Sequence, residues 1–307
     1  MVLPVLVLVV ADTVARAQDT GYVAGTSIKV DVRLVNLNVA VTDRAGQPYT
    51  ALKADNFRVY DNGIEETIHH FSTEDRPYTM GVVLDRSGSM AEMIRDVYRA
   101  AFHTVRASKP EDEFFIETFN EKNAMQQDFS QDREVLSRAL KDIDAYGGTA
   151  LYDAMLAGLE HVKRGSHDKK VLLVVTDGAD NSSTHRFQET LERARQESVA
   201  IYVVGMFDRL MVELEGQRED ALEGLLTQLA EATGGRAYFP KTVKQCEQAC
   251  IAIAQELRQQ YAIGYYPSHS MRDGSWHDVQ VQLHLPEDQG NKGLRARTRV
   301  GYYAPRE

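Results

Sequence analysis

The stretch GVVLDRSGSM, residues 81–90, joins an apolar segment to a series of short oxygen-bearing side chains. Its first half predicts a strand that is buried on both faces, as in a parallel sheet. Asp85, Ser87 and Ser89 follow this strand at alternating positions. Aspartate and serine at such a place either cap a turn or the start of a helix, or supply oxygen ligands to a hard cation. The choice between the two depends on the rest of the chain.

Apolar strands and amphipathic helices alternate along the middle of the chain. Further buried strands are predicted at residues 112–119 (DEFFIETF), 169–177 (KKVLLVVTD) and 199–207 (VAIYVVGMF). Intervening segments such as residues 93–108 (MIRDVYRAAFHTVRAS) repeat apolar side chains with the period of a helix. We therefore predict an α/β fold class, with a doubly wound, mainly parallel, Rossmann-like sheet that helices cover on both faces.

The two ends of the chain have the pattern of strands instead. Residues 28–41 (IKVDVRLVNLNVAV) alternate between apolar and polar side chains, and Asp61–Gly63 is a hairpin turn of the Asp-Asn-Gly type. Three more strands are predicted near the C-terminus, at residues 261–267 (YAIGYYP), 276–286 (WHDVQVQLHLP) and 294–305 (LRARTRVGYYAP). Because neither end can bury a good core by itself, we expect both to pair into one small β-sandwich-like module. The α/β domain is then an insertion in that module.

The first residues have the pattern of a targeting segment. An apolar run at residues 2–11 precedes Ala15-Arg16-Ala17, which has the small-x-small pattern of a cleavage site. We predict a signal peptide that is cleaved after Ala17, with a buried N-terminal strand as the alternative. No other stretch is long and apolar enough to span a bilayer. The mature chain is therefore expected to be exported without a membrane span, to the periplasm, the cell envelope or the extracellular space.

These patterns divide the chain into four parts. The predicted parts are a signal peptide at 1–17, an N-terminal β segment at 18–77, the α/β domain at 78–245, and a linking helix with the C-terminal β segment at 246–307. Cys246 and Cys250 lie four positions apart in the predicted linking helix. A disulfide within one continuous helix is geometrically awkward, so we expect both cysteines to be small core residues, with a strained disulfide as the alternative.

The charge balance bears on the class of partner. The formal net charge is -10, and 43% of the residues are hydrophobic, which is typical of a globular protein. An acidic chain attracts neither nucleic acid nor an anionic membrane surface through its average field. We therefore expect no nucleic-acid partner, and we predict no particular oligomeric state.

Oxygen-bearing side chains recur after other predicted strands. Thr149 follows a Gly-Gly turn before a helix, and Asp177 follows the apolar run LLVV. In an open parallel sheet, ligands bind beyond the carboxyl ends of the strands. Three hydroxyls and two carboxylates there would suit a hard divalent cation. Since such a site has a low protein charge, the ion could also bind a carboxylate from another molecule.

The motif DRSGSM resembles the D-x-S-x-S motif of the von Willebrand factor type A domain, and Thr149 and Asp177 match the other two metal-site positions. The five residues together resemble a complete metal-ion-dependent adhesion site, and the similarity extends roughly over residues 78–245. By this resemblance, the hydroxyls are direct or nearly direct ligands and the aspartates act through water. The metal residues so implied are Asp85, Ser87, Ser89, Thr149 and Asp177. The flanking segments resemble a bacterial family of exported von Willebrand factor A-related proteins.

The resemblance implies a non-enzymatic module for binding or adhesion. It would bind a divalent cation, Mg²⁺ first and Mn²⁺ or Ca²⁺ as alternatives, and through it a carboxylate of a protein partner. A scaffold with a structural or vestigial ion site is one alternative, and a metal-assisted hydrolase is another. The hydrolase lacks the usual motifs, such as H-E-x-x-H. Only Asp153 or His185 could serve as its base, and with Asp180 they are the candidates for residues that surround the metal site.

Overall fold

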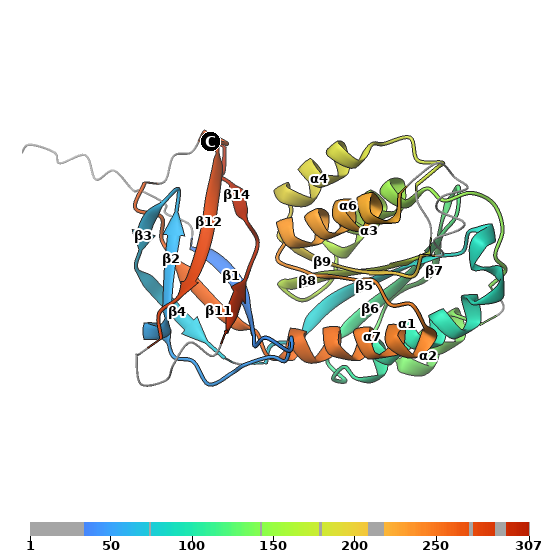
Figure 1. Ribbon diagram of the computed structural model, residues 1–307, viewed down its shortest axis with the longest axis horizontal. Helices are drawn as coiled ribbons and strands as arrows, with labels where there is room; N and C mark the ends of the chain where they lie inside the picture. Colours follow the sequence, from blue (N-terminus) through green and yellow to red (C-terminus); the bar gives the residue numbers. More distant parts are fainter. Residues whose placement is uncertain are drawn as a thin grey trace, which may run out of the picture. The chain divides into compact units, whose positions relative to one another are not determined.

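The central strand of the protein is β5 (Tyr78–Asp85), whose side chains are all buried. It lies in the middle of a six-stranded sheet in the computed structural model of the chain, shown in Figure 1. The described residues are 34–73, 75–141, 143–177, 180–207, 218–269, 273–285 and 293–306, and they belong to one compact unit. The predicted signal peptide lies outside the described residues.

The six-stranded sheet has the order β10-β9-β8-β5-β6-β7. The strands that join β5 are β6 (Glu113–Phe119), β7 (Asn123–Ser130), β8 (Lys169–Thr176), β9 (Val199–Gly205) and β10 (Ala237–Tyr238). All neighbours are parallel except β7, which is antiparallel to β6. The chain builds outward from β5 to β6 on one side and from β8 to β9 on the other. The prediction of a mainly parallel α/β sheet is thus confirmed, and its switch point lies between β5 and β8.

Helices cover both faces of this sheet (Figure 1). One face carries α1 (Ile94–Arg106), α2 (Arg133–Ala139) and α7 (Val243–Arg258), and the other carries α3 (Leu151–Val162), α4 (Phe187–Gln196) and α6 (Glu219–Ala232). Each face therefore has its own apolar core, because the side chains of a strand point alternately to its two sides. No helix within the described ranges is long and apolar enough to cross a membrane.

Helix α7, the predicted linking helix, packs against α1 rather than only connecting two modules. Cys246 and Cys250 are fully buried between these helices, among the same apolar side chains as the α1 face of the sheet. Both thiols are free. The prediction that the two cysteines are core residues is confirmed.

Strand β7 was not among the predicted elements. Its sequence, NAMQQDFS, has no apolar run, and its side chains are half-buried or exposed. An edge strand is paired on one side only and carries little of the core, so its periodicity is weak. The strand completes the sheet beyond β6.

The N- and C-terminal segments form two four-stranded sheets. The first has the order β13-β1-β11-β4, from Arg295–Arg297, Val35–Thr42, Tyr261–Tyr265 and Ile68–Ser72. The second has the order β14-β12-β2-β3, from Gly301–Tyr303, Trp276–Leu283, Phe57–Asp61 and Ile64–Glu66. Each sheet contains two strands from each end of the chain, and the apolar faces of the two sheets share one core. This confirms the predicted sandwich-like pairing.

One turn and one strand of this module can be compared directly with their predictions. The predicted hairpin turn is present between β2 and β3, where Asn62 and Gly63 have φ angles of 50° and 79°, as two-residue hairpins require. The segment at residues 294–305, predicted as one strand, is instead divided between the two sheets. Its middle also bonds to the α/β domain, because Arg299 forms a β-bridge with Thr233 and the Val300 amide donates to the Ala232 carbonyl.

Candidate functional site

The loops that follow β5 and precede α3 lie against each other at the carboxyl edge of the sheet. The Gly88 amide donates to the Gly147 carbonyl at 3.0 Å, and the Tyr146 amide donates to the Arg86 carbonyl at 3.0 Å. The Arg86 amide also donates to the Phe119 carbonyl at the end of β6, at 2.7 Å. These main-chain bonds hold the segment that contains Thr149 beside the one that contains Asp85, Ser87 and Ser89.

Asp85 is the most enclosed side chain of the site, with 0% of its surface exposed. Its Oδ1 accepts from the Ser87 amide at 2.8 Å, and its Oδ2 accepts from the Thr176 hydroxyl at 2.6 Å. Burial raises the pKa of Asp85, although the hydrogen bonds from Thr176 and Ser87 act in the opposite direction. A buried carboxylate of this kind is stabilised by a nearby positive charge, so the environment of Asp85 fits a cation.

The next three oxygen-bearing groups form a chain of contacts. The hydroxyl oxygens of Ser87 and Ser89 are 3.1 Å apart, and the Ser89 hydroxyl donates to Oδ1 of Asp177 at 3.0 Å. Ser87 precedes a short 3₁₀ helix, η2 (Gly88–Glu92), but its side chain makes no capping hydrogen bond there. The capping interpretation of the motif is therefore wrong for Ser87, whose hydroxyl faces the other ligand candidates instead.

Thr149 is nearly buried, with 3% of its surface exposed. Its amide donates to Oδ1 of Asn181 at 2.8 Å, and its carbonyl accepts from the amides of Asn181 and Ser182. These bonds fix the Thr149 main chain between α3 and the loop that follows β8. Within the described part of the chain, its hydroxyl forms no hydrogen bond with a protein group, which leaves that oxygen available to a ligand.

Asp153, Asp180 and His185, the residues predicted to surround the metal site, fix the loop that follows β8. The Asp153 carboxylate accepts from the amides and side chains of Thr184 and His185, including His185 Nδ1 at 2.7 Å. Burial would raise the pKa of Asp153, but these hydrogen bonds outweigh it and lower the pKa to about 2. Asp180 accepts from the Ser183 hydroxyl at 2.5 Å and from the Tyr152 amide at 3.4 Å. The group thus fastens residues 180–185 to the start of α3.

The types of donor limit which ion would fit. Among the described residues, no three His, Cys, Asp or Glu side chains gather closely enough to hold a metal. A cation at this edge would therefore depend on the hydroxyls of Ser87, Ser89 and Thr149 together with Asp85 and Asp177. Oxygen-only donors of this kind suit hard cations such as Mg²⁺, Mn²⁺ or Ca²⁺.

Several residues that shape the site were missed in the sequence. Thr176 orients Asp85, but a threonine at the end of an apolar strand looks like an ordinary strand residue. Tyr98 on α1 donates its hydroxyl to the Asp85 carbonyl at 2.8 Å, and this contact follows only from the packing of α1. Asn181 had a weak signal, since it belongs to the polar run DNSS directly after Asp177.

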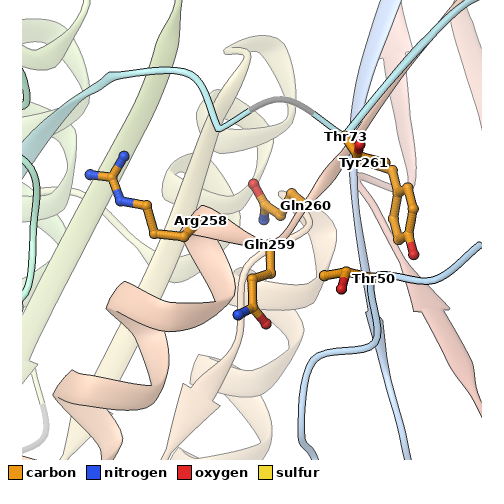
Figure 2. A pocket seen from close by; sticks show the side chains of 6 residues that line it. All are labelled: Thr50, Thr73, Arg258, Gln259, Gln260 and Tyr261. Carbon is orange, nitrogen blue, oxygen red and sulfur yellow. The ribbon is translucent and has the colours of Figure 1, made fainter.

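A pocket of about 330 Å³ lies elsewhere, where α7 ends and β11 begins (Figure 2). It is lined by Thr50, Thr73, Arg258, Gln259, Gln260 and Tyr261. Arg258 forms ion pairs with Asp75 and Asp112 and stacks over Tyr78, the first residue of β5. Since Asp85 is the last residue of that strand, the pocket is remote from the candidate cation site. Its charged side chain serves to fasten the end of α7.

Comparison with known proteins places this geometry in context. The family model of the von Willebrand factor type A domain matches residues 80–250. A von Willebrand factor type A structure from Catenulispora acidiphila is similar over 89% of this chain and 75% of its own, with a TM-score of 0.51 and 9% identity. Proximal thread matrix protein 1 from the mussel byssus, with a zinc-occupied MIDAS motif, is similar over 65% of this chain and 50% of its own, with a TM-score of 0.51 and 16% identity.

A third structure shows a weaker similarity. It is an aerotolerance-related membrane protein from Bacteroides fragilis, with 16% identity, a TM-score of 0.47, and coverage of 59% of this chain and 98% of its own. No curated protein matches the sequence. The two structures with a TM-score of 0.51 support the fold, and the family match covers more than half of the chain.

Proposed function

Because the chain belongs to the von Willebrand factor type A domain family, we propose that it is an exported, non-enzymatic binding module. It binds a divalent cation at the carboxyl edge of its parallel sheet and, through this ion, an acidic group of a protein partner. The proposed metal residues are Asp85, Ser87, Ser89, Thr149 and Asp177. Export rests on the apolar segment at residues 2–11 and the Ala15-Arg16-Ala17 pattern.

The observation that carries the proposal is the chain of contacts from Ser87 through Ser89 to Asp177. It joins side chains 90 positions apart, and it leaves the Ser87 hydroxyl free of any capping bond. Asp85 and Thr149 supply the remaining oxygens, the first oriented by Thr176 and the second without a protein partner for its hydroxyl among the described residues. The zinc-occupied MIDAS motif of the mussel protein is consistent with a divalent cation in this fold.

The chemistry of the donors explains why a partner carboxylate would bind. Two aspartates offset the charge of a divalent ion, and hydroxyl ligands add none. A magnesium ion usually retains several water ligands, and a carboxylate from outside can replace one of them. We expect Mg²⁺ first, with Mn²⁺ or Ca²⁺ as alternatives, because all three prefer oxygen ligands.

Isothermal titration calorimetry of the purified chain with Mg²⁺ tests the cation site. The Ser87→Ala variant should lose at least about ten-fold in Mg²⁺ affinity, since one hydroxyl ligand is gone. Ser137→Ala on α2 is the matched control and should bind Mg²⁺ as the wild type does. Equal heats for the wild type and Ser87→Ala would reject the proposed site. A pull-down from the native cell envelope, with Mg²⁺ and with chelator, then tests whether partner capture needs the ion.

A further inference from the structure

Arg86 lies beside the candidate cation site and has no anionic partner among the described residues. It lies between Asp85 and Ser87 and is half-buried. Its Nε atom is enclosed and has no hydrogen-bond partner, and no described residue forms an ion pair with its guanidinium. Nearly all buried polar groups in native proteins are paired, and leaving one unpaired costs roughly 1–3 kcal/mol. The enclosed Nε cannot be reached from outside, so the part of Arg86 that remains for a partner is the rest of its guanidinium fork, for which the described residues supply no acid.

The surroundings of Arg86 hold it at the edge of the sheet. Its amide and carbonyl are bonded to Phe119 and Tyr146, so its main chain is fixed between two loops. Its guanidinium carbon lies 4.8 Å from the centroid of the Tyr146 ring, which is a cation–π distance.

Tyr146 adds an exposed surface next to this charge. Its side chain is among the largest exposed hydrophobic groups of the described residues, with 55% of its surface accessible. Exposed tyrosine and arginine side chains are enriched among the residues that dominate binding interfaces. Arg86 and Tyr146 therefore form an adjoining pair, here called the Arg86–Tyr146 rim, on the loops that carry the candidate metal residues.

The chemistry of the guanidinium selects the ligand. Arginine presents a planar fork of N–H donors that matches a carboxylate in a bidentate manner. The net charge of the chain is -10, yet the rim and the proposed cation would place two positive centres at one edge. A partner with one carboxylate can bind the cation but leaves Arg86 unpaired. A partner with two carboxylates can satisfy both.

We propose that Arg86 is a second anchor for the partner, and that the partner presents two nearby carboxylates on one peptide segment. One carboxylate binds the cation, and the other pairs with the guanidinium that Tyr146 holds in place. This inference rests on the proposed cation site and specifies its ligand. Arg86 and Tyr146 thus determine which acidic segments are bound.

The test compares two labelled peptides of equal length in a glycine–serine background. One contains a single aspartate, and the other contains two aspartates separated by one residue. Fluorescence anisotropy with the full chain in Mg²⁺ should show about ten-fold tighter binding of the two-aspartate peptide, the gain typical of one charge-assisted pair. Arg86→Gln should abolish this preference, and Arg86→Lys should restore part of it. Arg106→Gln, at the exposed far end of α1, is the matched control and should retain it.

The outcomes separate this inference from the proposed function. Calorimetry should show that Arg86→Gln binds Mg²⁺ within about two-fold of the wild type, because its side chain is not a metal ligand. The inference is overturned if the wild type binds both peptides equally, binds neither, or keeps its preference in chelator. It is equally overturned if Arg86→Gln keeps the preference. The proposed cation site is still supported after any of these results if Mg²⁺ binding depends on Ser87. A wild type that binds no Mg²⁺ contradicts both the cation site and the inference on Arg86.

Discussion

At the scale of single residues, Glu117 is the unusual acid of the central sheet. It lies on β6 on the same side as Phe115 and Phe119, which belong to the apolar core under α3. Only 3% of its surface is exposed, and burial raises the pKa of Glu117 to about 7. A carboxyl group in such a place favours its neutral form, because the charged form loses its hydration.

The raised pKa predicts how stability changes with pH. In the unfolded chain Glu117 loses its proton near the ordinary value of 4.5, but in the folded chain it does so near 7. Between these values the folded state binds more protons, so the free energy of unfolding falls as pH rises, and the loss is complete above about 7. The difference corresponds to about 3 kcal/mol. Glu117→Gln should lose this slope and be more stable than the wild type at pH 8 by up to about that amount.

Urea unfolding in chelator at pH 5, 6, 7 and 8 measures this effect. The relevant quantity is the difference between the variant and the wild type at each pH, because other acids contribute to both. Glu231→Gln, on the exposed side of α6, is the control and should give a constant difference. If Glu117→Gln also gave a constant difference across this range, the raised pKa would not be linked to folding.

The candidate site was predictable at this scale because its residues follow apolar strands. Asp85 and Asp177 stand directly after buried runs, and the rule that ligands bind at carboxyl ends groups them. Thr176 and Tyr98, which orient Asp85, carry no such mark. No sequence pattern identifies Arg86 either, because whether an arginine has an acidic partner depends on which residues the fold brings near it. The sequence thus reveals candidate ligands but not the groups that position or surround them.

At the scale of elements, a buried carboxylate helps Arg258 to hold the end of α7. Glu256 is 2% exposed and accepts from the Tyr202 hydroxyl on β9 at 2.6 Å. It also forms ion pairs with Arg297 on β13 and with Arg236 beside β10, the latter at 3.8 Å. A single side chain therefore connects α7, the parallel sheet and the β-sandwich.

Removing this carboxylate should be costly. Glu256→Ala leaves Arg297 without its charge partner in a mostly buried place, and breaking a buried pair costs about 3–5 kcal/mol. Glu247→Ala on the same helix removes a partly exposed pair with His103, and such pairs contribute no more than about 1 kcal/mol. Denaturant unfolding of both variants gives the comparison. Similar losses for the two variants would show that Glu256 does not fasten the helix.

Helices and strands could be predicted from the sequence where a local pattern of apolar residues determines them. β5, β8 and β9 are continuous apolar runs, because each is buried on both faces. β7 escaped prediction because an edge strand needs no such run. The division of β13 from β14 could not be read from the sequence, because it depends on main-chain bonds to Ala232 and Thr233 at the end of α6. Gly234 permits this close approach, since a Cβ there would lie 2.6 Å from the Arg299 nitrogen.

At the scale of the whole molecule, the two sheets of the sandwich join strands from opposite ends of the described chain. Val39 pairs with Tyr261, and Val59 pairs with Val281. The sandwich therefore pairs strands that the inserted α/β domain separates along the chain. This long-range pairing carries an entropic cost that increases with the separation, and interactions between the two modules offset part of it.

Arg299 provides one of these interactions. Its Nη1 donates to the Ser198 hydroxyl before β9 at 2.9 Å, and its Nη2 donates to the Asn36 carbonyl on β1 at 3.2 Å. Its guanidinium also stacks over Tyr302 of β14, 5.5 Å from the ring centroid. The side chain thus contacts both sheets of the sandwich and the α/β domain. The adjacent β-bridge to Thr233 brings the main chain into the same junction.

Arg299→Ala should consequently weaken the coupling between the two modules. We expect a loss of about 1–3 kcal/mol from the two hydrogen bonds that Arg299 donates, since one such bond contributes roughly 0.5–1.5 kcal/mol. We also expect a change from one calorimetric unfolding transition to two. The sandwich should unfold first, because the α/β domain keeps both of its own apolar cores. Arg295→Ala, at an exposed position of the same segment, should retain one transition. A single transition for Arg299→Ala, at an unchanged temperature, would mean that strand pairing alone couples the modules.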